Sequence, residues 1–417
     1  MSSLGWIDFS SEHRDKVRTV LDLLKKQGVV DELGIGVIRD AFSDRMFPGI
    51  STVQTRAKYF TLVAYRIEAF MQRSGRKQTL ESYLSVSEKQ DRIKLVENHE
   101  GEGELGIIGG TFKTDWKRDV VRKPSSIYWN GLRTFGFVTP DTSLSEFSAR
   151  LSEGKTSLRQ VLRGTKEDDG DATQSYENRA PRVAVQSPDK EYWETLRIDL
   201  NLEEARLLRQ HITDQEPDSL IGQILLHPEW LEQTLQISVH APFKEFCELP
   251  FIKKIQVPGL TATVEHARDF WQVMKGAHIR YNCLLQRGAD DPALEEQFEV
   301  EWDEWLDDMN PFPDSWDNDF FWGLVGTRSG SIGPTNSFVA RWIEQTRQGC
   351  PDLGKCDELV RLQEMQNKGP RARLRSDNRE GHPSDWLGIR DLNYRLPIVL
   401  QILRDIYDAE MKGGDLA

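Results

Sequence analysis

Apolar residues recur at three- and four-residue steps along much of the chain, which is the spacing of amphipathic helices. The clearest stripe runs over residues 52–73, where Ser51 and Gln54 also have the spacing of a helix-capping box. This pattern predicts a long helix over 52–73. The same spacing predicts further helices over residues 10–26, 36–45, 79–97, 124–135, 201–211, 263–286, 292–309, 336–348, 356–367 and 397–411.

These elements predict a mainly α, multi-helical fold with a small winged-helix-like α+β module in the N-terminal half. The module is expected at residues 123–139, where a helix that ends at Gly136 precedes the extended pair Phe137-Val138. In a DNA-reading module of this kind, Tyr128, Asn130 and Arg133 would face the groove. An ordinary helix–strand junction has the same pattern and is the alternative.

One long polar segment, residues 164–190, contains Gly and Pro and lacks apolar periodicity. Such a segment is typical of a linker or a long surface loop. We therefore expect an N-terminal helical domain over 1–163, with helix-turn-helix-like segments, and a C-terminal helical domain over 191–417.

Net charge and composition argue against some classes of function. The 417 residues carry a net charge of −13, from 54 Lys and Arg against 67 Asp and Glu. This balance argues against a mainly electrostatic nucleic-acid binder but allows a local basic surface. The four cysteines lack CxxC spacing, the start of the sequence lacks the features of a signal peptide, and no apolar run reaches membrane-span length. These features predict a cytoplasmic protein with no membrane partner.

The most densely specified segment is residues 31–60, which combines glycines, acidic residues and basic residues. Arg39, Arg56 and Lys58 are candidates for gripping a phosphate or carboxylate, because guanidinium forks match these anions. The alternative is an internal network in which the same cations pair with nearby Asp residues and orient two helices.

A basic stretch near the C-terminus is a second candidate for nucleic-acid or anion binding. It could contact a nucleic-acid backbone or an acidic partner, remain a solvated loop, or dock within the chain against the acidic segment 290–319. Its candidate residues are Lys368, Arg371, Arg373 and Arg375.

The acidic segment 290–319 contains no Lys or Arg. On its predicted helix, Glu301, Glu304 and Asp308 would share one face, as oxygen ligands of a divalent ion require. The alternative is an acidic surface that carries Trp302 and Trp305 into the core. Because no zinc, nucleotide or nucleophile motif accompanies these carboxylates, we predict no metal and no cofactor.

Several stretches together resemble an uncharacterised bacterial family that is catalogued as a domain of unknown function. They read GWIDFS, DELGIGVIRDAFSDRMFPGISTVQTRAKYF, KPSSIYWNGLRTFGF and ARLRSDNR, the last followed by LNYR. The resemblance implies an association with anti-phage defence gene clusters, beside helicase-like and phospholipase-D-like proteins. It supplies no catalytic residues.

Two functions follow as hypotheses. The first is a non-enzymatic accessory or scaffold subunit of a bacterial multi-protein antiviral defence system, which would contact other subunits of the complex and, through local basic patches, DNA. The second is a divergent metal-dependent nuclease or hydrolase that uses the acidic helix. Co-purification with a larger assembly would favour the first hypothesis, and a bound divalent ion the second.

Overall fold

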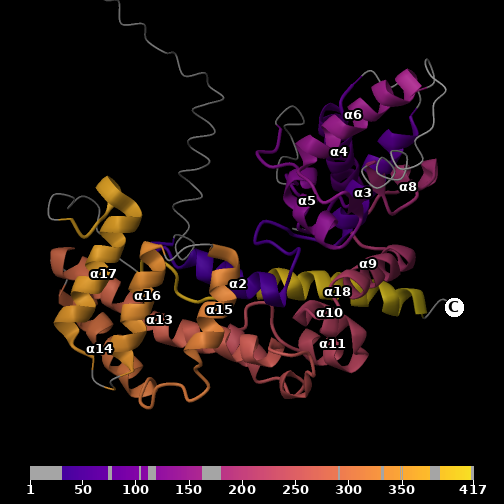
Figure 1. Ribbon diagram of the computed structural model, residues 1–417. Coiled ribbons are helices and arrows are strands. Elements are labelled where there is room, and N and C mark those ends of the chain that lie inside the picture. Colours follow the sequence, from indigo (N-terminus) through magenta and orange to yellow (C-terminus); the bar gives the residue numbers. More distant parts are fainter. Residues whose placement is uncertain are drawn as a thin grey trace, which may run out of the picture. The chain divides into compact units, whose positions relative to one another are not determined.

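A computed structural model describes most of the chain, and its described residues are mainly helical, as predicted. Two short strands form the one sheet in this part of the chain. The chain divides into two compact units, each assembled from separate stretches (Figure 1). The described residues are 31–73, 78–102, 105–110, 119–161, 180–289, 292–329, 333–347, 349, 351–375 and 386–414.

Unit 1 comprises residues 1–43, 242–248 and 261–394. Its central element is α13 (Leu260–Ala289), which is buried over most of its length. The first part of α2 (Gly36–Met46) also belongs to this unit. Its other helices are α12 (Phe243–Cys247), α14 (Pro292–Asp308), α15 (Asn318–Ser329), α16 (Pro334–Thr346), α17 (Leu353–Lys368) and η2 (Gly369–Arg371).

Tryptophans from neighbouring helices fix the packing around α13. The indole N–H groups of Trp305 and Trp342 donate to the carbonyls of Gln272 and Val273, at 2.7 and 2.9 Å. Gly276 lets this packing close, because a Cβ there would lie 2.4 Å from the Trp305 ring. The aromatic rings thereby bury apolar area while their polar N–H groups keep partners.

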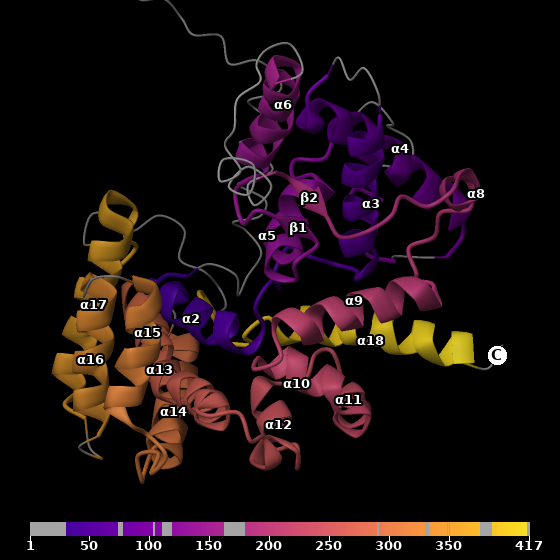
Figure 2. The same ribbon diagram turned by 45° about the vertical axis from the view of Figure 1, so that its right-hand side comes forward.

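Unit 2 comprises residues 44–241, 249–260 and 395–417, with α3 (Lys58–Gln72) against α4 (Leu80–Asn98), α5 (Pro124–Thr134) and α9 (Leu202–Gln215). The final helix, α18 (Leu396–Gly414), lies beside α9 in both views (Figures 1 and 2). The remaining elements are β1 (Val138–Thr139), α6 (Leu144–Val161), β2 (Arg182–Val183), α8 (Lys190–Glu194), α10 (Leu220–Leu226), α11 (Pro228–Leu235) and η1 (Ile252–Lys254).

Most predicted helices are confirmed, with shifts of a few residues at their ends. They correspond to α2, α4, α5, α9, α13, α14, α16, α17 and α18. The helix predicted over residues 10–26 lies outside the described residues. No helix among the described residues has the length and apolar character needed to cross a membrane.

The helix predicted over 52–73 begins six residues late, at Lys58. Tertiary contacts take the place of its first turns. The Tyr128 hydroxyl accepts the N–H groups of Thr55 and Arg56, and Asp405 accepts that of Ala57. The capping box is only half formed, because Gln54 accepts the Ser51 N–H at 3.1 Å while the Ser51 hydroxyl has no partner.

The winged-helix prediction differs from the structure in two ways. Tyr128 is fully buried under α3 and does not face a groove. β1 is followed by α6, and its partner is β2, with Val138 opposite Val183 and Thr139 opposite Arg182. The ordinary helix–strand junction describes this segment better.

The predicted boundary at 164–190 also differs from the observed division. Unit 2 contains residues from both sides of it, because α9 and α18 pack against each other and α9 packs against α3. Within the segment, residues 182–183 form β2 rather than loop. Residues 164–179 lie outside the described part of the chain.

Candidate functional site

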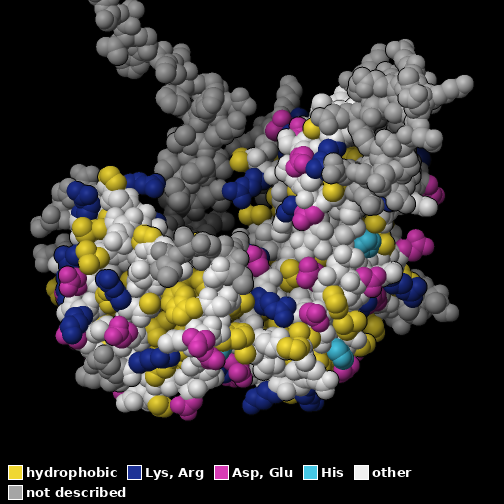
Figure 3. Space-filling model, in the orientation of Figure 1, with side chains coloured by type: hydrophobic (Ala, Val, Ile, Leu, Met, Phe, Trp, Pro, Cys, Tyr) yellow, Lys and Arg dark blue, Asp and Glu magenta, His cyan; other side chains and the backbone are white. Residues whose placement is uncertain are grey.

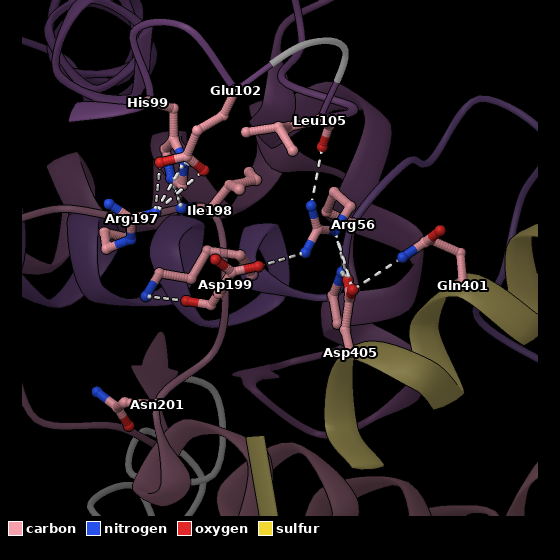
Figure 4. A network of polar contacts seen from close by, with 12 residues as sticks. Arg56, His99, Glu102, Leu105, Arg197, Ile198, Asp199, Asn201, Gln401 and Asp405 are labelled. Atoms are coloured by element: carbon pink, nitrogen blue, oxygen red, sulfur yellow. Dashed lines mark hydrogen bonds and ion pairs between the residues drawn. The ribbon is translucent and has the colours of Figure 1, made fainter. Parts of the chain in front are cut away.

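Arg56 is the centre of a polar network in unit 2 (Figure 4). Its Nε donates to both carboxylate oxygens of Asp405 at 2.9 Å, and Nη2 donates to Asp199 Oδ1 at 2.8 Å. Nη1 donates to the carbonyl of Leu105 at 2.9 Å. Asp405 also accepts from Gln401 at 2.9 Å. One guanidinium thus joins α18, the segment before α9 and the loop after α4.

Lys58, two residues further along, is paired just as completely. Its ammonium lies 2.7 Å from Glu204 Oε2 and donates to the Asp199 carbonyl at 3.2 Å. Glu204 also accepts the hydroxyls of Tyr192 and Thr61, at 2.7 and 3.3 Å. Burial lowers the pKa of Lys58, and the carboxylate of Glu204 opposes that shift.

These contacts locate the first group of predicted anion-binding residues. Arg56 and Lys58 lie close together and share Asp199, with carboxylates in the positions an anion would take. Arg39 belongs to unit 1 and pairs with its neighbour Asp40 at 3.0 Å. The arrangement is the one that the internal-network alternative requires.

A histidine fixes the segment that carries Asp199 (Figure 4). His99 Nε2 accepts the N–H of Ile198 at 3.0 Å, so its proton lies on Nδ1, 2.8 Å from Glu102 Oε2. Arg197 donates to the same carboxylate at 2.9 Å. The end of α4 and the start of α9 are thereby joined.

The glycine-containing loop 105–110 is held by the Arg56 network at one end and reaches α3 at the other. The N–H of Ile108 donates to the Tyr59 hydroxyl at 2.9 Å. Gly109 has a φ of +73°, and a Cβ there would lie 2.4 Å from Val120 and 3.1 Å from Arg92. Glycine allows both this backbone conformation and the close approach.

This loop forms one wall of a pocket whose other walls are α3, α4 and residues 119–124. The enclosed space between its side chains is small, about 30 Å³, which admits only a ligand of a few atoms. Apolar walls come from Leu62, Val63, Ile108, Val120 and Pro124. The charged side chains that line it are Arg66, Glu88, Lys89, Asp91, Arg92, Asp119 and Lys123.

Glu88 is the most unusual group in the pocket. Its side chain is buried, and Oε1 accepts the N–H of Ser125, in the first turn of α5, at 2.6 Å. Oε2 is buried without a hydrogen-bond partner. Burial is the largest cause that raises the pKa of Glu88 to about 7, and the nearby charge of Asp91 adds to it. Glu88 therefore exchanges a proton near neutral pH.

Asp91, one turn further along α4, instead has a hydrogen-bond partner for each carboxylate oxygen. Both of its oxygens accept from Arg66, whose Nε lies 2.9 Å away. The Arg66 guanidinium also lies 3.5 Å from the centroid of the Trp193 ring. This ion pair and cation–π contact fix one side of the pocket.

Two further cations lie at the other side of the pocket. The Lys123 ammonium donates to the Ser85 hydroxyl at 2.7 Å, and Lys89 lies 3.5 Å from Asp119. The lining contains four cations and three carboxyl groups, so its charge is net positive even with Glu88 ionised. A positive pocket with an unpartnered carboxyl group can bind a polar ligand or exchange a proton with it.

The sequence contained a signal for this site that we did not use. The buried face of α4 continues the helical spacing of Leu80 and Leu84, but its middle positions carry polar and charged side chains. Charged residues at core positions of an apolar stripe indicate a buried polar site. The residues concerned are Ser87, Glu88, Asp91 and Arg92.

The remaining predicted cations lie apart from this pocket. Arg133 forms an ion pair with the exposed Asp141 at 2.6 Å. In unit 1, Lys368 lies 3.1 Å from Glu32, and buried Glu364 accepts the backbone N–H groups of residues 373 and 374. The basic turn thus docks on carboxylates outside 290–319. The side chains of Arg371, Arg373 and Arg375 are exposed there.

Surface charge is mixed on the face of the molecule shown in Figure 3. On this face, Lys and Arg side chains alternate with Asp and Glu side chains.

The acidic helix α14 buries its tryptophans as the second alternative predicted, with Trp302 and Trp305 at 4% and 2% exposure. Asp303, Glu304, Asp307 and Asp308 are exposed. Glu299 on the same helix pairs with the fully buried Arg280 at 2.8 Å. Among the described residues, no three His, Cys, Asp or Glu side chains gather in a way that could hold a metal ion.

Comparison with known families gives a match to the first part of the chain. Residues 1–164 are similar to the family of unknown function DUF6361, which confirms the resemblance to an uncharacterised family for this part of the chain. The pocket residues, from Tyr59 to Pro124, all lie within the matched region. No curated protein and no solved structure matches the chain.

Proposed function

We propose that the chain is a non-enzymatic, ligand-binding accessory subunit, and that unit 2 binds a small polar molecule in the Glu88 pocket. The observation that carries this proposal is Glu88, a residue of the pocket lining whose Oε2 atom is buried without a hydrogen-bond partner. An unsatisfied buried acceptor costs about 1–3 kcal/mol, and a bound ligand would offset this cost.

The surroundings of Glu88 support a role in binding. The pocket combines apolar walls with a few convergent polar groups, and its small volume limits the ligand to a few atoms. Its walls are rigidly supported, since the Arg56 network fixes the loop and the Arg66–Asp91 pair joins α3 to α4. Such supported side chains are pre-organised for a ligand.

The accessory role places this ligand-binding unit in a larger assembly, the bacterial antiviral defence complex of the first hypothesis. Unit 1 would then supply contacts to other subunits, and its exposed basic turn at 371–375 would contact DNA. The mixed surface charge and the net charge of −13 fit protein partners better than a mainly nucleic-acid partner.

One observation favours a second function, acid–base catalysis by Glu88. A carboxyl group with a pKa of about 7 is matched to proton transfer at neutral pH. In that case the chain alone would convert the molecule that it binds. The acidic helix α14 has no comparable feature, because its carboxylates are exposed, paired with arginines or, at half-buried Glu301, in contact with Gln297.

The test of ligand binding is a thermal-unfolding screen of the full chain against small acids, amines, sugars and nucleotides. A ligand at 100 times its Kd stabilises the folded state by about 2.7 kcal/mol, which raises the unfolding temperature measurably. We expect one class to do so with the natural protein and with the control Glu232→Gln, whose residue is exposed in the same unit. Glu88→Gln and Lys123→Met should reduce the shift.

Each outcome bears on the proposal. Stabilisation that survives both pocket substitutions would place the ligand elsewhere, and a lack of stabilisation by every class would contradict a ligand site. Affinity purification from the bacterial host with mass spectrometry tests the accessory role, and recovery of the chain alone would contradict it. Conversion of the ligand by the purified chain, lost in Glu88→Gln, would establish the enzyme instead.

A further inference from the structure

We infer that the ligand of this pocket is a small oxyanion, a carboxylate or a phosphate-like group, held between Lys123 and the protonated side chain of Glu88. This inference rests on the proposed ligand site and specifies its chemistry. It starts from charge, because four cations and three carboxyl groups line the pocket. An anion lowers the net positive charge of the lining, whereas a cation would raise it.

The hydrogen-bonding capacity of Lys123 points to the same ligand. An ammonium group has three N–H donors, and Ser85 accepts one of them at 2.7 Å. The charge of Lys123 acts on Glu88 and opposes the rise of its pKa. Lys123 therefore has two further N–H donors for an acceptor oxygen of the ligand.

Glu88 becomes that second donor when it carries a proton. Oε1 accepts the N–H of Ser125, so the proton belongs on Oε2, which makes no hydrogen bond of ordinary geometry although the Ser125 side chain lies near enough to lower the pKa of Glu88. The resulting O–H···O⁻ bond to an anion is of the strong, charge-assisted type. Ionised Glu88 would instead repel the anion and leave its own buried acceptor unsatisfied.

This arrangement predicts the direction of the pH dependence. The charged groups around Glu88 come from α3, α4 and the segment before α5, and burial raises its pKa to about 7. If only the protonated form binds the anion, affinity falls about tenfold per pH unit above this pKa. The charged groups around Glu88 are Arg66 on α3, Lys89, Asp91 and Arg92 on α4, and Asp119 and Lys123 before α5.

Calorimetric titration of the full chain with sulfate and with acetate tests the inference, because neither probe changes its charge between pH 6 and pH 8.5. With a Glu88 pKa of about 7, affinity for both should fall about 30-fold across this range. Glu88→Gln keeps an N–H donor but cannot ionise, so it should bind at pH 6 and lose most of the pH dependence. The probe that binds more tightly shows whether the ligand is a carboxylate or a phosphate-like group.

Substitution of a pocket lysine and of an exposed lysine provides a matched pair of variants. Lys123→Met should weaken both probes at least about tenfold, as loss of a charge-assisted hydrogen bond predicts. Lys190→Met, at a residue whose side chain is 91% exposed on α8 of the same unit, should leave them unchanged. Circular dichroism of each variant establishes that it is folded.

Contrary results separate this inference from the proposed function. Affinity that rises with pH, or binding of an amine or neutral compound that depends on Glu88 without binding of sulfate or acetate, would overturn the oxyanion and leave the ligand site intact. If no probe of any class binds, both proposals fail. Sulfate or acetate binding that is equal in the natural protein and Lys123→Met would place the anion outside this pocket.

Discussion

Two groups of buried charges in unit 2 contrast in how completely they are satisfied. Around Arg56 and Lys58, the buried carboxylates of Asp405 and Glu204 accept several hydrogen bonds each. At Glu88 in the nearby pocket, one carboxylate oxygen has a partner and the other has none. Both groups are buried and both lie near cations, so burial and charge alone do not distinguish them.

This difference in hydrogen bonding distinguishes buried charges that stabilise the fold from a buried charge that can bind a ligand. A charge whose hydrogen bonds are all made within the chain can be explained by stability alone, as at Asp405. A buried oxygen without a partner costs free energy and needs another explanation, which the pocket in front of Glu88 supplies. Substitutions in the two groups should therefore differ in kind as well as in size.

The largest effect is expected at the fully paired group. Asp405→Ala leaves the Arg56 guanidinium, whose side chain is 11% exposed, without its main partner and removes the acceptor of the Ala57 N–H. Breaking one side of a buried ion pair costs about 3–5 kcal/mol. Urea unfolding followed by circular dichroism should show this loss of unfolding free energy.

The double variant Arg56→Met/Asp405→Leu is the control for that explanation. It removes both charges and leaves none unpaired, so it should cost less than Asp405→Ala despite changing more atoms. If the double variant is the less stable of the two, the ion pair itself contributes net stability, and the unpaired charge is not the cause.

At Glu88 the expected effect depends on pH. The folded-state pKa of about 7 lies above the ordinary value of 4.5, so the stabilisation by protonated Glu88 is complete below about pH 4.5 and is lost as pH rises through 7. Between pH 5 and pH 8 this loss is about 2.5 kcal/mol in the natural protein, at 1.36 kcal/mol per pKa unit. Glu88→Gln should lack it.

Unfolding free energies of the natural protein, Glu88→Gln and Glu232→Gln at both pH values test this expectation. Relative to the natural protein, Glu88→Gln should gain stability as pH rises, and the exposed control should not change. A parallel pH dependence in all three proteins would show that Glu88 is ionised throughout, and would remove the contrast between the two groups.

Local patterns in the sequence were sufficient for most of the helices. The stripes over 79–97 and 397–411 match α4 and α18 because each helix buries one continuous face. The start of α3 at Lys58 was not predictable, because distant Tyr128 and Asp405 satisfy the N–H groups that an earlier start would have used. The same holds for the pairing of β1 with β2, which are more than forty residues apart.

The candidate site shows a similar limit. The sequence singled out Arg56 and Lys58 as candidate anion-binding residues, but their partners in the structure come from α9, the segment before it and α18, at separations above 140 residues. Glu88 was detectable in principle, as a charge within the buried stripe of α4. Its unpartnered oxygen was not, because that property depends on how α5 and loop 105–110 close around it.

A smaller effect is expected in the glycine loop that connects the two groups. Gly109→Ala meets a φ of +73° and a Cβ position 2.4 Å from Val120, whereas Gly101→Ala meets a similar φ of +89° with nothing within 4 Å. The left-handed conformation alone costs about 1–2 kcal/mol in either variant. Gly109→Ala should cost more and should weaken ligand binding, since it displaces the pocket wall. Equal stability losses with unchanged binding would separate the loop from the site.

The smallest effect is expected at the exposed pair of Arg133 and Asp141. Their 2.6 Å contact is as short as those at Arg56 and Lys58, but the Asp141 side chain is 79% exposed. Water solvates either charge when the other is removed, so Asp141→Ala should change the unfolding free energy by at most about 1 kcal/mol, and by less at high salt. Urea unfolding beside Asp405→Ala compares the two carboxylates directly. A loss as large as that of Asp405→Ala would mean that contact distance, rather than burial and complete pairing, sets the stability of these arginine pairs.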